Sequence, residues 1–462
     1  MKGVLDELPE SLDDTYERVL RSINKANRDH ALRLLQCVTV AVRPLHVEEL
    51  AEVLAVDFDA ARNGGIPNFK SDWRWADQHQ AVLSTCSSLI AIVDNGYSQV
   101  VQFSHFSVKE FLTSDRLACS SGHVSRYHIL LSPAHTIVAQ ACLGVLLRLD
   151  KHDNASEFSL AYYAARYWVE HAQFEDVSSH IQDVMEYFFD ADKPHWAAWH
   201  RMYDIDDHQW PHFTPLPVTS PVPLYYAALC GFYDLAEHLV VKNPEHVNVR
   251  GGEMVTPLVA ALHRSRFRVA DLLHERGSDI NARGAWGATV LHEASCDGLV
   301  DIVRWLLDHG ADPNPRDTCN FAPLHLLRVL KFPEVSRMLL EHNADVNARD
   351  ELGKVPLHWV AMAKGLGVRD PKDMLKTMQL LLDHGADPNV RDDDGCTPLH
   401  DSSWWKKGNF GPFRGTVEGS RLLLDHGANI DAENNEGKTP LQLALQAGYR
   451  EMVEFLSGRG AK

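Results

Sequence analysis

The sequence of 462 residues predicts a mostly α-helical protein, in which a winged-helix and helical region is followed by an α-solenoid. Two observations predict this class. A short phrase of the form Thr-Pro-Leu-His, with variants, returns seven times in the C-terminal half, and a fixed period of 30 to 40 residues is typical of solenoids. Ahead of the repeats, amphipathic helical stripes lead to a hairpin with an Asn-Gly turn, which is the order of elements in a winged helix.

The first residues of the seven phrases lie 34, 33, 33, 33, 42 and 42 residues apart. The copies are Val222–Tyr225, Thr256–Val259, Thr289–His292, Ala322–His325, Val355–His358, Thr397–His400 and Thr439–Gln442. A second phrase keeps a constant offset from the first in four copies: His309–Asn314, His342–Asn347, His384–Asn389 and His426–Asp431. Two motifs that recur in register resemble the ankyrin repeat, and the resemblance covers about residues 220–462.

Each repeat contains the signals of a helix pair. The Thr that opens the phrase is placed to cap the first turn, and the Pro after it fits the first helical position. A second apolar run follows and ends at a glycine such as Gly310, Gly385 or Gly427, where we expect a positive φ. One helix pair cannot bury its apolar side alone, so neighbouring pairs must stack and form an extended surface.

The first 220 residues predict three segments. Residues 1–120 form the winged-helix region, with helices over 5–42, around 46–55 and near 82–90, a hairpin of 91–93 with 100–103, and a helix over 104–112. Residues 121–200 form a helical region. A proline-containing acidic stretch, 201–219, is the predicted linker to the repeats at 220–462.

The N-terminal segments resemble a known arrangement. They are similar to the winged-helix segment of fungal NACHT–ankyrin proteins, itself similar to one in relatives of GPI inositol-deacylase. The matching stretches are Leu8–Tyr16, Arg43–Leu50, Phe103–Leu112, Ser159–His171 and Pro223–Gly231. In that family the segment follows a NACHT ATPase domain, which has no counterpart in these 462 residues, so ATP-driven switching does not carry over. The resemblance implies a signalling protein in which the repeats act as the sensor.

Composition and charge exclude several classes of protein. The net charge is −18, and residues 1–220 carry 18 Lys and Arg against 30 Asp and Glu, so we expect no nucleic-acid partner. There is no run of 18 apolar residues and no signal-peptide core, and the eight cysteines form no Cys-x-x-Cys pair. We expect a cytoplasmic protein with no membrane partner.

Candidate chemistry is sparse, and we expect neither an enzyme nor a cofactor or metal. A string like the nucleotide-binding P-loop, Ala432–Thr439, crosses a predicted hairpin tip instead of joining a strand to a helix, and its Glu433 and Glu436 would repel phosphate. The recurring histidines read as repeat residues that bond the backbone between neighbours. The Ser104-His105 pair reads as a helix cap, and the third winged-helix helix carries three glutamates and no cation, which disfavours DNA.

A protein-binding surface remains as the candidate site. In ankyrin proteins the residues after the first phrase face the concave groove, as do the hairpin tips. Carried over, these positions include Glu293, Cys296, Asp297, Leu326, Val329, Leu330, Trp359, Met362, Asp401, Trp404 and Trp405. The apolar ones, and Trp above all, are the candidates for partner contact. The alternative is that some of these tryptophans pack on the insertions of the two long repeats.

Two further features extend this candidate surface. Trp286 lies alone at one predicted hairpin tip. Two nine-residue insertions fall between paired helices, around Lys364–Lys372 and Lys406–Thr416, and the second holds Phe410 and Phe413 between cations. Arginines recur in register at the hairpin tips and form a ladder: Arg283, Arg316, Arg349 and Arg391. The neighbouring Asp317, Asp350 and Asp392 are predicted to neutralise their charge.

The sequence therefore predicts a non-catalytic protein–protein interaction module of a signalling or regulatory protein, with a protein partner in the concave face of the repeats. The partner-binding residues are predicted to be Trp286, Leu326, Val329, Trp359, Met362, Trp404, Trp405, Phe410 and Phe413. The alternative is a targeting or regulatory arm of an enzyme or ATPase whose catalytic domain is absent from this chain. A winged-helix DNA binder is a third hypothesis.

Overall fold

A computed structural model describes most of the chain, and it is mostly α-helical as predicted. The described residues are 12–58, 66–86, 88–94, 96, 98–149, 154–190, 192–203, 222–252, 254–329, 333–362, 371–403, 405–408, 411–414 and 416–462. They fall into two compact units. Unit 1 comprises residues 1–208, 219–252 and 268–276, and unit 2 comprises 209–218, 253–267 and 277–462. The predicted linker lies mostly outside the described residues, and the predicted domain boundaries stay predictions.

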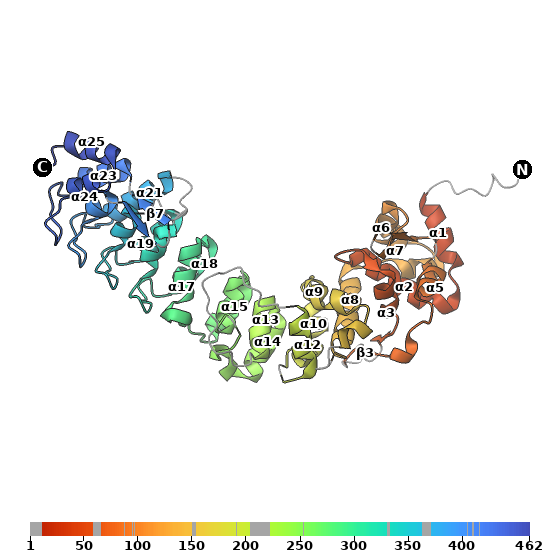
Figure 1. Ribbon diagram of the computed structural model, residues 1–462. Coiled ribbons are helices and arrows are strands. Elements are labelled where there is room, and N and C mark those ends of the chain that lie inside the picture. The colour runs from red at the N-terminus through yellow and green to blue at the C-terminus, as the bar shows by residue number, and fades with distance from the viewer. Residues whose placement is uncertain are drawn as a thin grey trace, which may run out of the picture. The chain divides into compact units, whose positions relative to one another are not determined.

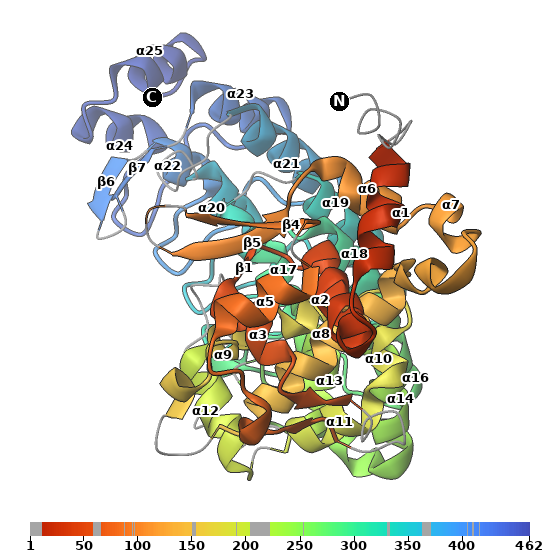
Figure 2. The same cartoon turned by 90° about the vertical axis from the view of Figure 1, so that its right-hand side faces the viewer.

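Unit 1 begins with the winged-helix region, where helices pack on a small sheet (Figure 2). The helices are α1 (Leu12–Ser22), α2 (Arg28–Val40), α3 (Val47–Val53), α5 (Gln78–Cys86), α6 (Phe106–Leu112) and α7 (Asp115–Ala118). The main sheet has the order β1 (Leu45–His46), β5 (Gln99–Phe103) and β4 (Ile90–Asp94), and a small pair joins β2 (Val56–Asp57) to β3 (Asn68–Phe69). Ile92 lies opposite Val101 in the antiparallel β4–β5 pair, which confirms the predicted hairpin.

The predicted cap of α6 is half right. The His105 ring accepts a hydrogen bond from the Ser107 backbone N–H at 3.3 Å, as an N-cap side chain should. Ser104 does not cap the helix, because its hydroxyl donates to the Leu89 carbonyl 3.2 Å away. The serine therefore closes the end of the hairpin.

The rest of unit 1 is helical and includes the first repeat. Its helices are α8 (Leu131–Leu146), α9 (Ala161–Ala172), α10 (Val177–His180), α11 (Gln182–Phe188), α12 (Pro194–Met202), α13 (Pro223–Cys230) and α14 (Tyr233–Lys242). An aromatic cluster forms much of the core. The Trp168 ring lies 5.3 Å from Phe188, 6.0 Å from Trp199 and 5.9 Å from Phe232, and all four are buried. Phe232 belongs to the first repeat, so this repeat shares the core of the helical region.

A buried polar chain ties α8 to α9. Tyr163 Oη lies 2.8 Å from His171 Nε2, and His171 Nδ1 lies 2.9 Å from His135 Nδ1. The His135 ring stacks on Phe174 with centroids 4.1 Å apart. Burial and the nearby His135 hold the pKa of His171 at about 3, so both rings are neutral and one donates to the other.

Unit 2 stacks the later repeats as successive helix pairs (Figure 1). The first helices of the pairs are α15 (Pro257–His263), α17 (Val290–Asp297), η7 (Pro323–Val329), α20 (Pro356–Ala361), α22 (Pro398–Ser403) and α24 (Pro440–Gln446). The second helices are α16 (Phe267–Glu275, mostly in unit 1), α18 (Val300–Asp308), α19 (Pro333–Glu341), α21 (Pro371–Asp383), α23 (Val417–Asp425) and α25 (Arg450–Gly458). The fourth repeat differs from the prediction because its first helix, η7, is a 3₁₀ helix.

Two of the four Thr caps form as the sequence predicts, whereas the Thr289 and Thr397 hydroxyls bond the rings of His292 and His400. The Thr256 and Thr439 hydroxyls each accept a backbone N–H three residues on, at 3.4 Å. Gly310, Gly385 and Gly427 have φ values of 84°, 89° and 88°, which an L-residue with a side chain rarely adopts. These local signals fix where each helix begins and ends.

Asparagine side chains connect the hairpin loops of successive repeats. The Asn281 Oδ1 accepts the Asp312 N–H at 3.0 Å, and Asn314 accepts the Asp345 N–H at 2.7 Å. The same bond recurs across the long repeats, from Asp387 to Asn347 and from Asn429 to Asn389. The hairpin edge therefore keeps one register from Asn281 to Asn429.

The two nine-residue insertions lie between the paired helices, as predicted. After the first, α21 has 13 residues, whereas the other second helices have nine. Residues 363–370 of that insertion lie outside the described residues. The second insertion is a β-hairpin, β6 (Trp405–Gly408) with β7 (Gly411–Arg414), where a surface loop was expected.

Candidate functional site

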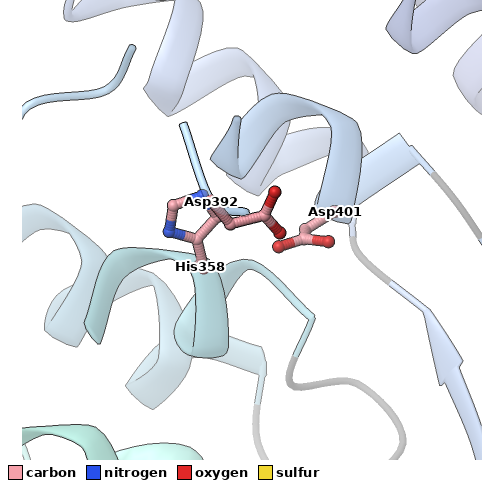
Figure 3. Close-up of side chains that lie close together, drawn as sticks. All are labelled: His358, Asp392 and Asp401. Atoms are coloured by element: carbon pink, nitrogen blue, oxygen red, sulfur yellow. The ribbon is translucent and has the colours of Figure 1, made fainter. Parts of the chain in front are cut away.

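A largely buried cation, Lys354, connects the fifth and sixth repeats on the face formed by the first helices and the hairpins. Lys354 Nζ lies 2.6 Å from Asp392 Oδ2 and 2.7 Å from Asp401 Oδ2. Lys354 precedes α20, Asp392 is in the next hairpin and Asp401 is on α22. Both carboxylates are buried and point toward each other in Figure 3, which also draws His358. We call Lys354, Asp392 and Asp401 the lysine triad.

The charge of the triad is set by its neighbours. Burial lowers the pKa of Lys354, but the carboxylates of Asp401 and Asp392 raise it by more. The pKa of Lys354 therefore lies above its ordinary value. The ammonium therefore stays charged. Removing it would leave two buried carboxylates facing each other.

The same residues have the composition of a metal site. His358, Asp392 and Asp401 each offer one ligand atom, and these atoms lie within 4.8 Å of one another. The donors are already in use, because both carboxylates bind the ammonium of Lys354. His358 Nδ1 accepts the Val355 N–H at 3.2 Å, and its Nε2 donates to the Cys396 carbonyl at 3.1 Å. The arrangement joins repeats and offers no free donor pair to a cation.

Three histidines of the first phrase, His292, His358 and His400, bond the backbone of the next repeat as predicted, whereas the buried Nε2 of His325 has no partner among the described residues. His292 donates from Nε2 to the Phe321 carbonyl at 3.0 Å, and His400 to the Lys438 carbonyl at 3.1 Å. Burial holds the pKa of each ring below its ordinary value, so each is a neutral imidazole that accepts at Nδ1 and donates at Nε2. The histidines of the second phrase act differently, since His309 and His384 bond the carbonyl four residues earlier in their own helix.

The arginine ladder bonds backbone carbonyls in the contacts that the structure gives, and its predicted neutralisation by the neighbouring aspartates stays a prediction. Arg316 Nη1 donates to the Asn320 and Arg349 carbonyls, both at 3.0 Å, and Arg349 repeats the pattern with Gly353 and Arg391. The aspartates beside them have other partners. The Asp350 carboxylate accepts from Trp359, for example, and Asp392 belongs to the lysine triad. The ladder is therefore part of the hairpin backbone network.

Trp359 is only partly available to a partner. Its Nε1 donates to Asp350 Oδ2 at 2.8 Å, and its ring lies 5.5 Å from the Phe321 ring at an interplanar angle of 63°. The side chain is half-buried. Its position corresponds to that of Asp401 one repeat later, and Phe321 corresponds to Lys354. An aromatic pair and an ion pair thus occupy equivalent junctions of successive repeats.

The other predicted site residues differ in exposure, and some of them lie outside the described residues. Leu326 is half-buried in η7, and Met362 is half-buried at the end of α20. Trp286 is 64% exposed at its hairpin tip, with φ at 55°. Trp404 and Phe410 lie outside the described residues, as do the side chains of Val329, Trp405 and Phe413. The β6–β7 register places Trp405 opposite Arg414 and Lys406 opposite Phe413.

The Glu293 carboxyl group is buried and lacks a hydrogen-bond partner for one of its oxygens. It lies on α17 at the position equivalent to Trp359, and its Oε2 is buried with no hydrogen-bond partner among the described residues. Burial, together with the Asp297 carboxylate, raises the pKa of Glu293 to about 9. The side chain is therefore a neutral acid at pH 7, which sequence position alone does not reveal.

The P-loop-like string lies at a hairpin tip, where its backbone amides are already bonded. The Glu436 and Lys438 N–H groups both donate to the Asn434 side chain, at 3.0 and 2.9 Å.

In unit 1, Glu49 and Glu52 of α3, the predicted third helix of the winged helix, are buried. Arg43 binds Glu49 through two bonds of 2.8 and 2.6 Å, and Glu52 accepts the Leu160 N–H at 2.6 Å. The acidic side of α3 thus packs within unit 1.

Comparison with known proteins agrees with both parts of the fold. Residues 224–317 and 371–462 match the family model "Ankyrin repeats (3 copies)", and residues 16–122 match "GPI inositol-deacylase, winged helix domain". The chain therefore carries ankyrin repeats and a winged-helix domain of the GPI inositol-deacylase type. The predicted NACHT context is not part of either match.

Two curated proteins are similar to parts of the chain. "Azaphilone pigments biosynthesis cluster protein L" of Monascus ruber is 31% identical over 303 residues, which cover 60% of this chain and 61% of that protein. "Alpha-latrocrustotoxin-Lt1a" of Latrodectus tredecimguttatus is 39% identical over 67 residues, or 14% of this chain and 5% of the toxin. The chain thus matches about three fifths of the first relative's length.

In the part of the chain that the structure describes, no helix combines the length and apolarity that a membrane span requires.

Proposed function

We propose that the chain is a non-catalytic protein–protein interaction module, and that its repeats bind a protein partner along the hairpin tips and the adjoining first-helix face. Ankyrin repeats in general serve protein interaction. On this face the arginines, histidines and lysine described above bond the protein itself. Side chains that point away from such networks are therefore the ones available to a partner.

The observation that carries the proposal is the pattern of the hairpin tips. Equivalent tip positions in five successive hairpins hold Trp286, Cys319, Leu352, Asp394 and Glu436, all of them exposed. Trp286 is 64% and Leu352 57% exposed, which is unusual for side chains of this size. The tips therefore change from apolar to acidic along the stack. We call this set the tip row.

Backbone hydrogen bonds hold the tip row in register. The Thr318 N–H donates to the Trp286 carbonyl at 2.8 Å, and the Glu351 N–H to the Cys319 carbonyl at 3.3 Å. The next tips repeat the bond, from Asp393 to Leu352 at 3.1 Å and from Asn435 to Asp394 at 3.0 Å. A surface ordered in advance loses little entropy when it binds, so it favours recognition.

The partner chemistry follows from the pattern. An apolar segment fits against Trp286 and Leu352, and a basic segment fits beside Asp394 and Glu436. Trp359, Leu326 and Met362 extend the apolar area onto the first helices. The signalling role, in an NLR-like protein with the repeats as sensor, is part of this proposal, and so are cytoplasmic location and the lack of a nucleic-acid or membrane partner.

The test compares two double variants of the full chain. Trp286→Ser with Leu352→Ser removes the apolar tips. Tyr162→Ser with Leu130→Ser is the control, because these residues are 64% and 58% exposed and lie outside the repeats. A partner is first recovered from the source organism with the wild-type chain and purified, and its affinity is then measured by interferometry. We expect the tip variant to lose at least tenfold in affinity and the control to keep it. Equal affinity for both variants contradicts the proposal.

The alternative function is a targeting or regulatory arm of an enzyme or ATPase whose catalytic domain is absent from this chain. The winged-helix match, which names a domain of an enzyme, is the observation that favours it. Titration calorimetry with ATP and Mg²⁺ tests for nucleotide binding by the chain itself. We expect no heat, because the amides of the P-loop-like string are already bonded. Micromolar binding would favour the alternative.

A further inference from the structure

A polar pocket of about 930 Å³ opens in unit 1 and is lined by no residue of the repeats. Ligand pockets in proteins commonly have volumes of 300 to 1,000 Å³. Helix α8 packs against both α2 and α10, and the pocket lies between these three helices. Its lining residues are Asp29, Leu32, Arg33, Gln36, Ser132, Pro133, Thr136, Ile137, Gln140, Glu175, Asp176 and His180.

The lining comes from two helical stripes. Residues 29, 32, 33 and 36 share one side of α2, and residues 132, 133, 136, 137 and 140 share one side of α8, because neighbours on a helix surface are three or four residues apart. Leu32 and Ile137 contribute apolar surface. The segment after α9 closes one side with Glu175 and Asp176.

Two side-chain amides inside the pocket have no partner. Gln140 is only 9% exposed and Gln36 is half-buried, and neither amide makes a hydrogen bond with any residue that the structure describes. Neither amide is among the buried polar atoms that lack a partner, so solvent in the pocket reaches them and a ligand there can replace that solvent. Each amide presents an acceptor oxygen and two donor N–H groups. A peptide bond or a carboxamide is complementary to that pattern.

The rim of the pocket favours a positive charge. The Ser132 hydroxyl donates to the Asp176 carboxylate and is the main cause of its lowered pKa, so Asp176 is ionised. Glu175 is exposed beside it, while Asp29 is paired with Arg126. Arg33 lies over the Phe58 ring at 4.7 Å. His180 also lines the pocket, with its Nδ1 3.8 Å from Asp176 Oδ2, and it adds positive charge only when protonated. With His180 neutral, the carboxylates of Glu175 and Asp176 at the entrance attract a cationic ligand and repel an anionic one.

The rim is held in place by the polar chain described above. His135 stacks on Phe174, and His171 contacts His135, so the end of α9 is fixed on α8. Asp176 also carries the bond from Ser132 of α8. The pocket is therefore formed before a ligand arrives, as most ligand sites are.

From these features we infer that the pocket between α2, α8 and α10 binds an amide-bearing ligand with a cationic group. The amides of the ligand pair with Gln36 and Gln140, and its cation lies at Glu175 and Asp176. This chemistry occurs in a lysine- or arginine-containing peptide segment and in a small amidated amine. The inference is independent of the proposed function, because the pocket uses no residue of the repeats.

The probe for the test is N-acetyl-L-lysine methylamide, which carries two amides and one ammonium. It has about 14 non-hydrogen atoms, so at the efficiency of drug-sized ligands a Kd of about 1 mM is expected. The full chain, with ¹⁵N in its glutamine side chains, is titrated while the amide signals are followed by NMR. We expect the signals of Gln36 and Gln140 to shift together. No shift of either signal at about ten times that concentration overturns the inference.

Matched probes and variants separate the parts of the recognition. N-acetyl-L-glutamate methylamide keeps the amides and reverses the charge, and pentylamine keeps the charge without amides. Both are expected to bind at least fivefold more weakly, and equal binding of either contradicts the assigned chemistry. A tripeptide, acetyl-Ala-Lys-Ala methylamide, distinguishes the sources: tighter binding assigns the pocket to a peptide, and unchanged or weaker binding to a small molecule.

Gln140→Leu is the decisive variant. It removes an amide that makes no hydrogen bond within the described residues and faces the pocket, so we expect little change in Tm and no detectable binding of the lysine probe. Asp176→Asn should weaken the lysine probe by about two- to fivefold, as expected for an exposed charge pair. Gln182→Leu, on α11 and outside the pocket, is the control and should bind as wild type. Wild-type binding by Gln140→Leu, or a lower Tm with binding retained, overturns the inference.

Discussion

Replacing Lys354 by Met tests whether the lysine triad joins the fifth and sixth repeats. The substitution keeps most of the side-chain volume and removes the ammonium. The side chains of Asp392 and Asp401 are 2% and 9% exposed, so both carboxylates would stay buried without a counter-ion. Breaking a buried ion pair from one side costs about 3–5 kcal/mol, because the remaining charge is uncompensated.

The assay is hydrogen exchange of the full chain, read by mass spectrometry on peptides around residues 350–362 and 390–402. A repeat stack opens locally, so exchange reports the junction better than a global unfolding midpoint does. Since about 1.4 kcal/mol corresponds to a factor of ten, exchange at this junction should accelerate by roughly two to four orders of magnitude. Peptides of unit 1 should keep their rates.

Two further variants decide the reasoning. Lys376→Met makes the same substitution in an exposed pair with Asp373, where the lysine is 66% exposed, and should cost less than about 1 kcal/mol. Lys354→Met combined with Asp401→Leu restores an apolar junction like that of Phe321 with Trp359 and should recover most of the loss. If Lys354→Met exchanges no faster than Lys376→Met, or if the double variant is worse than the single one, the triad does not join the repeats.

Three other predictions follow from the titratable groups and the tip row. Glu293 has a pKa of about 9 in the fold against 4.5 in the unfolded chain, so the free energy of unfolding falls as pH rises above 4.5. Glu293→Gln should therefore stabilise the chain at pH 7 by up to about 3 kcal/mol in urea denaturation. A destabilised variant would contradict the assignment. The neutral His292, His358 and His400 take up protons when the chain unfolds, so their contribution to stability is complete above pH 6.5 and falls below it by up to about 1.4 kcal/mol per pH unit for each ring. The measurement uses the Glu293→Gln variant, because Glu293 acts in the opposite direction; urea midpoints that stay flat from pH 7 to pH 5 would show that the rings titrate in the fold as they do in the unfolded chain. Trp286→Ala should change Tm by no more than about 2 °C, because the side chain is 64% exposed, and a larger fall would mean that the tip supports the fold.

The sequence predicts the local parts of this structure well. A Thr cap, a Pro at the first helical position and a Gly with positive φ act within a few residues of each other, so Thr256 and Gly310 behave as their neighbours imply. The sequence also predicts the bonds of His292, His358 and His400, because residues repeated in register commonly perform the same task, although His325 does not make this bond. The Asn-Gly turn likewise predicts the β4–β5 hairpin from a short stretch.

Contacts between distant positions were not predictable in this way. Lys354 meets carboxylates 38 and 47 residues later, and no periodic signal marks an individual lysine as their partner. Trp359 was a predicted partner-binding residue, but its Nε1 already bonds Asp350. Aligning the residue before each phrase with the residue after the next phrase pairs Lys354 with Asp401 and Phe321 with Trp359, but it does not reveal the bond from Trp359 to Asp350, which lies within one repeat. The chemical state of Glu293 depends on burial, which a single sequence does not specify.

The asparagine bonds of the hairpin edge have an evolutionary consequence. The bond between neighbouring hairpins spans 31 residues in the short repeats, at Asn281 and Asn314, and 40 in the long ones, at Asn347 and Asn389, yet the partners correspond. Added chain at the opposite edge therefore leaves the register of the hairpins unchanged. The two edges of the stack are free to diverge separately, so one edge can lengthen over generations while the other conserves a fixed pattern of contacts.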